Sequence, residues 1–143
     1  MDSHLTAMLI VCVVTPGANY AFTPEDVEAL VPAMQAADVV LLQLEIPLES
    51  VAAALRLARA CGTLSILDAG PARAVSNEIL DLADIVSPNE TEAEALTGVP
   101  VGPDGDPRAA AGTLLALGVE HVVMKLGARG SLYVAANEEL AAP

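Results

Sequence analysis

With 143 residues, of which 54% are hydrophobic, the chain has the size of one domain and enough apolar side chains for a core. Nineteen acidic residues against six basic ones give a formal net charge of −13. This charge argues against binding to nucleic-acid phosphates or to an anionic membrane surface. No apolar run reaches the ~18 residues that span a bilayer, and residues 1–4 lack the basic start of a signal peptide, so we expect a soluble cytoplasmic protein.

The cysteines and histidines do not form a recognisable site. Cys12 falls in an apolar run and Cys61 at a helix end, so both are interpreted as buried thiols of a reducing compartment. His4 and His121 are far apart in the sequence and are treated as structural or surface residues. The chain also lacks the Rossmann and P-loop glycine motifs, the Gly-x-Ser-x-Gly elbow and zinc-ligand spacing, so these site types are unsupported.

The first elements are a strand and a helix. Residues 8–14 form a continuous apolar run, which is typical of a buried strand. Thr23 is a good N-cap, and Pro24 with the acids after it predicts a helix start. Apolar residues at helical spacing continue to Met34, but Pro32 lies within them. We therefore expect either a kinked helix or two short pieces.

A second strand, residues 38–44, ends at Glu45. Open α/β sheets bind ligands beyond the carboxyl ends of their strands, which makes Glu45 a candidate ligand contact. The alternative is an ordinary solvated loop acid. Residues 47–61 then give the clearest helical periodicity in the chain, and Gly62 supplies its C-terminal stop.

The middle of the chain repeats this strand and helix alternation. Residues 64–67 predict a third strand, which again ends in a polar loop at residues 68–73. A short helix is expected over residues 76–82, followed by a buried strand at residues 84–86.

The turn after that strand organises the chain. Pro88 disfavours helix at Ser87, so the strand should end there. Asn89 is a good N-cap, and Glu92 has the spacing of its capping-box partner in a short helix that ends before Gly98. On spacing alone, structural capping is favoured over function, because acids suit the first turn of any helix. The same N-terminus would suit a phosphate held through a divalent cation.

The last third predicts one helix and two strands. In chain order, we expect a loop at 99–107, a helix at 108–117, a strand at 121–126, a glycine turn at 127–130, a returning strand at 131–134 and an acidic tail at 137–143 with no assigned structure. The alternation of strands and helices throughout implies right-handed crossovers. The predicted fold class is therefore α/β: three αβα layers around a mostly parallel sheet, with an antiparallel hairpin near the C-terminus.

Four segments occur in the order seen in ribokinase-like carbohydrate kinases, the PfkB family. They are Gln43–Val51, Pro71–Arg73, Asp84–Glu94 and Lys125–Gly130. The resemblance runs from about residue 17 to about residue 135, and its Asn-Glu-x-Glu and Leu-Gly-x-x-Gly turns are specific when found together. Within the family, the Gln-Leu-Glu stretch is most similar to ribokinase. The resemblance implies transfer of a phosphoryl group from MgATP to a sugar hydroxyl, with activation by a monovalent cation expected from the family alone.

The resemblance also implies a role for individual residues. Glu45 matches the acid that hydrogen-bonds sugar hydroxyls. Asn89 and Glu92 match the turn that organises the phosphates and Mg²⁺, with Glu92 acting on the metal directly or through water. Gly127 and Gly130 match the loop that lines the nucleotide site, and Lys125 is assigned to nucleotide or phosphate binding with them. Phosphoryl transfer depends on positioning and charge neutralisation, so this context favours function over capping alone for the Asn-Glu-x-Glu turn.

The sequence departs from the family pattern in several places. No Gly-Ala-Gly-Asp motif, which supplies the family's catalytic base and anion hole, occurs in the chain. Gly17-Ala18-Asn19 only echoes the family's sugar-binding glycines and is not assigned to the sugar. Residues 68–70 are Asp-Ala-Gly where ribokinase-like sequences often have Asn-Pro-Ala, and Lys125 stands where Thr is common in ribokinases. The identity of the sugar therefore stays open.

We expect residues 1–143 to form a single α/β domain, the central part of such a kinase without its N-terminal sugar and lid part and its C-terminal catalytic part. The chain alone is then expected to be inactive and to self-associate, or form a homo-oligomer, through an unpaired sheet edge. The alternatives are a non-catalytic binding or assembly module, a gene remnant with the kinase fold, or a kinase for a nucleoside or a vitamin precursor.

Overall fold

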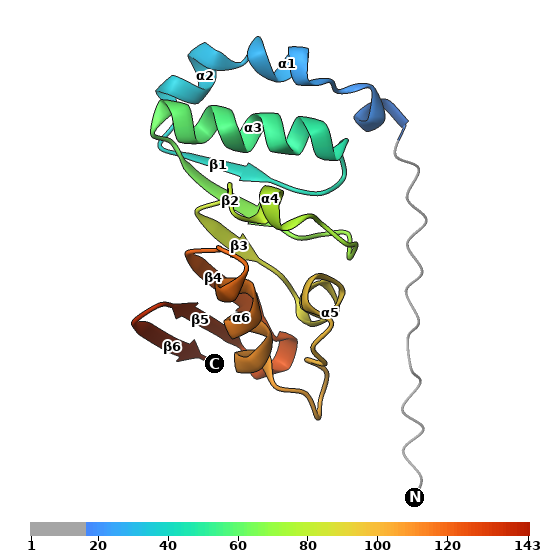
Figure 1. The fold of residues 1–143 in the computed structure, drawn as a ribbon, viewed down its shortest axis with the longest axis vertical. Coiled ribbons are helices and arrows are strands. Elements are labelled where there is room, and N and C mark those ends of the chain that lie inside the picture. The colour runs from blue at the N-terminus through green and yellow to red at the C-terminus, as the bar shows by residue number, and fades with distance from the viewer. Residues whose placement is uncertain (1–16) are drawn as a thin grey trace, which may run out of the picture.

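The computed structural model describes residues 17–143, which form a six-stranded mixed sheet with flanking helices (Figure 1). The strands are β1 (Val39–Leu42), β2 (Leu64–Asp68), β3 (Ile85–Ser87), β4 (His121–Lys125), β5 (Ser131–Ala135) and β6 (Glu138–Ala142). They lie side by side in chain order. The predicted strand at residues 8–14, Cys12 and His4 fall outside the described residues.

Within residues 17–143, six α-helices and two 3-10 helices connect and cover these strands. They are η1 (Gly17–Ala21), α1 (Pro24–Glu28), α2 (Val31–Ala36), α3 (Leu48–Cys61), α4 (Asn77–Leu80), α5 (Glu90–Thr97), α6 (Pro107–Ala116) and η2 (Gly127–Arg129). Figure 1 shows α3 running along β1 and β2, with α1 and α2 beyond it, and α6 packed near β4.

Local sequence signals explain where the helices begin and end. Thr23 caps α1 in a full capping box with Asp26. Helix α1 ends at Glu28 and α2 starts at Val31 with Pro32 in its first turn, so the second of the two alternatives, two short pieces, is the correct one. Gly62 closes α3 in the left-handed conformation, with φ of 73°.

The sheet is parallel from β1 through β4 and antiparallel from β4 through β6. The predicted hairpin after the 127–130 turn is confirmed. The acidic tail that had no assigned structure forms β6, which pairs with β5 from Glu138 opposite Ala135 to Ala142 opposite Ser131. Its side chains are all exposed, so β6 has none of the alternation of apolar and polar residues that would have indicated a strand.

One face of the sheet carries the core. Inward side chains of successive strands pack against α3, α5 and α6, and the fully buried ones include Leu67, Val86, Val122 and Met124. The predicted apolar face of α3 is buried as expected. On the outer face and edge the apolar side chains of Val39, Leu41 and Leu64 are exposed, Leu41 to 72%. Within the described residues, β1 is the edge strand on this side of the sheet.

Two further expectations can be compared with the structure. Cys61 is the last residue of α3 and is only partly buried, not fully buried as predicted, because its side chain sits at the open end of the helix. In the described part of the chain, none of the helices is both long enough and apolar enough to cross a membrane.

Candidate functional site at the carboxyl edge of the sheet

Polar side chains follow the carboxyl ends of the parallel strands. Glu45 comes after β1, Asp68 ends β2, Asn89 comes after β3, and Gly127 comes after β4. Since parallel strands place their carboxyl ends on one edge of a sheet, all of these residues lie on the same rim. The topology therefore brings Glu45, the Asn89 turn and the Gly127 loop, which the sequence indicated separately, to one rim. A hydrogen bond from the Leu44 N–H to the Gly70 carbonyl oxygen (2.8 Å) ties the first two loops together.

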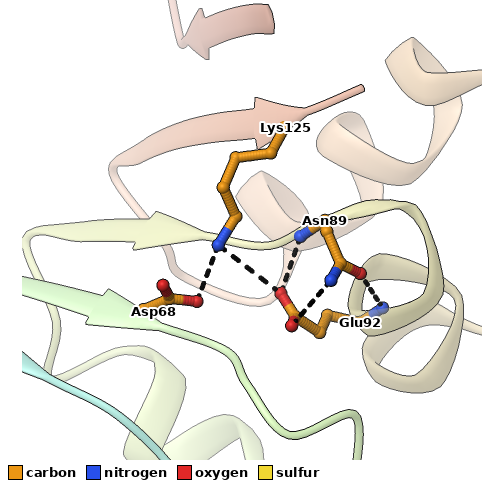
Figure 2. Close-up of polar contacts among 4 residues, drawn as sticks. All are labelled: Asp68, Asn89, Glu92 and Lys125. Atoms are coloured by element: carbon orange, nitrogen blue, oxygen red, sulfur yellow. Dashed lines mark hydrogen bonds and ion pairs between the residues drawn. The ribbon is translucent and has the colours of Figure 1, made fainter. Parts of the chain in front are cut away.

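The Asn89 turn is held by a capping box that Figure 2 shows in detail. The backbone N–H of Glu92 donates to Oδ1 of Asn89 (2.9 Å). In return the Glu92 carboxylate accepts twice from Asn89, from its backbone N–H (2.7 Å) and from its Nδ2 (2.8 Å). Glu92 is only 7% exposed, and a buried carboxylate needs such donors. The predicted capping box is confirmed.

Lys125 links the Asn89 turn to the end of β2. Its backbone N–H donates to the Pro88 carbonyl oxygen (2.8 Å), which fixes the end of β4 beside the turn. Its Nζ donates to Oδ1 of Asp68 (2.7 Å) and lies 3.8 Å from Oε2 of Glu92 (Figure 2). The Lys125 side chain is 41% exposed, so the ammonium group is accessible from solvent while two carboxylates hold it in place.

Two cavities adjoin at this ion pair. The first, of about 380 Å³, is lined by Asn19, Leu41, Leu42, Gln43, Glu45, Ile46 and Asp68. The second, of about 270 Å³, is lined by Asn89, Glu90, Thr91, Lys125 and Gly127. Asp68 belongs to the first cavity and Lys125 to the second, so their ion pair is the boundary between the two.

The two predicted loop glycines differ in surroundings. Gly127 lines the second cavity and has φ of 55°, with open space where a Cβ would stand. Gly130 has φ of 81°, and a Cβ there would overlap the Ala142 carbonyl oxygen of β6. Gly130 does not line either cavity. Its glycine is therefore explained by the close approach of β6, whereas Gly127 leaves backbone open to a ligand.

Sequence reasoning missed two residues of this rim. Asp68 was noted as the start of a polar loop and as a departure from the family pattern but was not assigned to the site, although its place at a strand's carboxyl end was the signal that could have found it. Asn19 was set aside from the sugar, yet it lines the same cavity as Glu45. The pairing of Asp68 with Lys125 spans 57 positions of sequence, and no local pattern indicates such a contact.

The carboxylates at this rim are suited to Mg²⁺ that is bound through water. Mg²⁺ keeps several waters and usually takes one or two carboxylates together with substrate phosphates. Glu92 and Asp68 supply two carboxylates near the second cavity, and the described residues hold no cluster of three or more metal-binding side chains. Both Glu92 oxygens already accept hydrogen bonds from Asn89. The arrangement therefore suits a metal bound through water better than direct coordination.

Comparison with known proteins agrees with this geometry. The family model of the pfkB family carbohydrate kinases matches residues 10–143. The chain belongs to this family. Among curated relatives of this pfkB chain, the ribokinase of Staphylococcus aureus (strain COL) is 39% identical over 122 residues, which are 85% of the chain and 40% of the relative.

Solved structures show the same fold. The crystal structure of Sa239 matches with a TM-score of 0.85 and 38% identity, covering 91% of this chain and 43% of that one. The structure of Arabidopsis thaliana ribokinase complexed with ribose and ATP matches with a TM-score of 0.80 and 34% identity, again over 91% and 43%. The predicted α/β fold of three layers is confirmed. The chain spans about 40% of the length of these relatives.

Proposed function

We propose that this chain carries part of the active site of a ribokinase-like kinase, which transfers the γ-phosphoryl group of MgATP to a hydroxyl of a sugar. One observation supports this most strongly: two cavities meet at the Asp68–Lys125 ion pair, one containing Glu45 and the other containing Asn89 and Gly127. Phosphoryl transfer requires two substrates side by side with groups that neutralise charge between them.

Each residue has a role in this proposal. Glu45 accepts hydrogen bonds from sugar hydroxyls in the first cavity, where its exposed carboxylate has no partner within the described residues. Lys125 and Asn89 contact phosphate oxygens in the second cavity, and the open backbone at Gly127 lets the nucleotide approach, with Gly130 keeping that turn in shape. Glu92 holds Mg²⁺ through water. When bound, this metal neutralises the charge that develops on the transferring phosphoryl group.

The proposal includes little or no turnover by these 143 residues alone. No Gly-Ala-Gly-Asp motif occurs among them, and the resemblance assigns that motif the base and the anion hole. A general base is worth about 10²–10⁴-fold in rate, and an anion hole about 10²–10³-fold. Binding of substrates is therefore expected to persist better than chemistry. We place the protein in the cytoplasm, as its charge and composition favour.

The sugar is tested by direct comparison. Relatives include deoxyribokinase of Salmonella typhi, 33% identical over 128 residues, as well as the ribokinases. Calorimetric titration of the chain with ribose, with 2-deoxyribose and with MgATP should give binding of MgATP and of one sugar. Glu45→Gln should weaken the sugar at least tenfold and leave MgATP unchanged. Glu49→Gln on the exposed first turn of α3 is the matched control and should leave both unchanged.

Turnover and binding together separate the alternatives. A coupled assay of ADP release with Mg²⁺ and the bound sugar should show little or no rate. A rate that disappears in Glu92→Ala would contradict the expected inactivity. Binding of neither MgATP nor any sugar would contradict the proposed function and favour a non-catalytic module. Binding of MgATP with a nucleoside in place of a sugar would favour a kinase of the nucleoside class.

A further inference from the structure

The Asp68–Lys125 ion pair connects the ends of two strands that are not neighbours in the sheet. Asp68 ends β2 and Lys125 ends β4, with β3 between them. Their side chains are 28% and 41% exposed. Ion pairs with this much solvent access contribute little to stability, so stability alone does not account for a contact that lies where two cavities meet.

The charges around Lys125 are unbalanced. Two carboxylates, Asp68 at 2.7 Å and Glu92 at 3.8 Å, surround one ammonium group. Glu92 is fixed by Asn89 and nearly buried, whereas Asp68 accepts no other hydrogen bond from the described residues beyond the one from Lys125. A phosphate that enters the second cavity therefore competes with Asp68 for the same ammonium group.

We propose that Asp68 is a positioning residue that holds Lys125 at the boundary of the two cavities and releases it to phosphate when a ligand occupies the first cavity. Hydroxyl groups of a ligand beside Glu45 can donate to Asp68, which lines that cavity. Such bonds weaken the hold of Asp68 on Lys125 and free the ammonium group for the phosphate. Binding in the two cavities is then cooperative, and by linkage each ligand strengthens the other equally.

This inference rests on the proposed function, and its test uses a simpler probe than the reaction. The 143-residue chain is titrated by calorimetry with inorganic tripolyphosphate without Mg²⁺. Asp68→Asn keeps the shape of the side chain and removes its charge. We expect it to bind tripolyphosphate about fivefold more tightly than the unmodified chain, the effect of one charge–charge interaction at about 4 Å in water. Lys125→Met should bind it about fivefold more weakly.

A double-mutant cycle distinguishes positioning from general electrostatics. If Asp68 acts through Lys125, Asp68→Asn should gain less than twofold in the Lys125→Met background. Glu90→Gln is the matched control, because Glu90 lines the second cavity together with Lys125 but pairs with Arg129. The increase in tripolyphosphate affinity from Glu90→Gln should be the same with and without Lys125→Met. Equal gains for Asp68→Asn in both backgrounds would overturn the proposal.

The cooperative part has its own readout. The sugar that binds in the calorimetric comparison should tighten tripolyphosphate binding at least threefold in the unmodified chain. It should leave the tripolyphosphate affinity of Asp68→Asn unchanged. The thermal unfolding midpoints of the unmodified chain and Asp68→Asn should agree. If Asp68 had a purely structural role, the midpoint of Asp68→Asn would be lower. Sugar and tripolyphosphate that bind without affecting each other would overturn this inference and leave the proposed function intact. Failure of every variant to bind tripolyphosphate would overturn this inference, whereas the proposed function is overturned only if MgATP and the sugars also fail to bind.

Discussion

Glu92 caps helix α5 and is proposed to hold Mg²⁺, whereas an ordinary capping residue has only the first of these roles. Replacing Glu92 with Ala tests for the second role. The substitution removes two charged hydrogen bonds to Asn89 and the 3.8 Å approach to Lys125. Loss of a capping interaction costs about 0.5–2 kcal/mol. Because Glu92 is only 7% exposed, we expect the upper end, about 2 kcal/mol of unfolding free energy, whereas the part-exposed Lys125 contact adds little.

The chain offers a matched control in its other capping box. In α1 the Thr23 N–H donates to Oδ2 of Asp26 (2.8 Å), the same arrangement at an exposed position away from both cavities. Asp26→Ala should cost only about 0.5–1 kcal/mol.

In urea, with a slope of about 2 kcal/mol per molar, the unfolding midpoint should fall by about 1 M for Glu92→Ala and by about 0.25–0.5 M for Asp26→Ala. Glu92→Ala should also lose MgATP binding in calorimetry, and Asp26→Ala should retain it. Equal midpoint shifts together with unchanged MgATP affinity in both variants would refute the reasoning.

Three further outcomes are expected. The pKa of the Glu94 carboxyl is lowered by hydrogen bonds from two backbone N–H groups of the 99–106 loop; a lowered folded pKa gives stability that is present above the unfolded pKa and lost as pH falls through the folded one. Hydrogen exchange of that loop, corrected for intrinsic rates, should therefore speed up on acidification in the unmodified chain, and Glu94→Gln should abolish this pH dependence. Gly130→Ala should destabilise the chain far more than Gly127→Ala, which bears only the left-handed strain of about 1–2 kcal/mol; equal urea midpoints would contradict the β6 explanation. Leu41→Lys at the exposed sheet edge should reduce self-association in sedimentation experiments. If the unmodified chain self-associates and the variant has the same molecular mass, this edge is not the surface through which it does so.

Much of the fold follows from local sequence signals. The N-cap at Thr23, the capping box at Asn89 and the helix stop at Gly62 were predicted because each depends on residues within a few positions of one another. Strand β6 was not predicted, because its exposed residues lack the alternation that marks a strand. It forms through backbone pairing with β5 after a turn at residues 136–137 reverses the chain.

The site was predictable in its outline but not in its connections. Glu45 and the Asn89 turn could be placed on one rim, since topology alone brings the ends of parallel strands together. The sequence also indicated two departures from the family pattern, Asp68 and Lys125, as separate features. The structure shows that they contact each other across β3, 2.7 Å apart. Such a contact depends on strand order and side-chain reach, which no single segment encodes.

The central claim is that Glu45, the Asn89 turn and the Gly127 loop form one binding site for a sugar and a nucleotide. Backbone amide spectra of the isotopically labelled chain, titrated first with ribose or 2-deoxyribose and then with MgATP, test it most directly. We expect the sugar to shift the amides of Asn19 and Glu45, and MgATP to shift those of Asn89 and Gly127. Shifts confined to the opposite end of β4, around His121, would contradict the account.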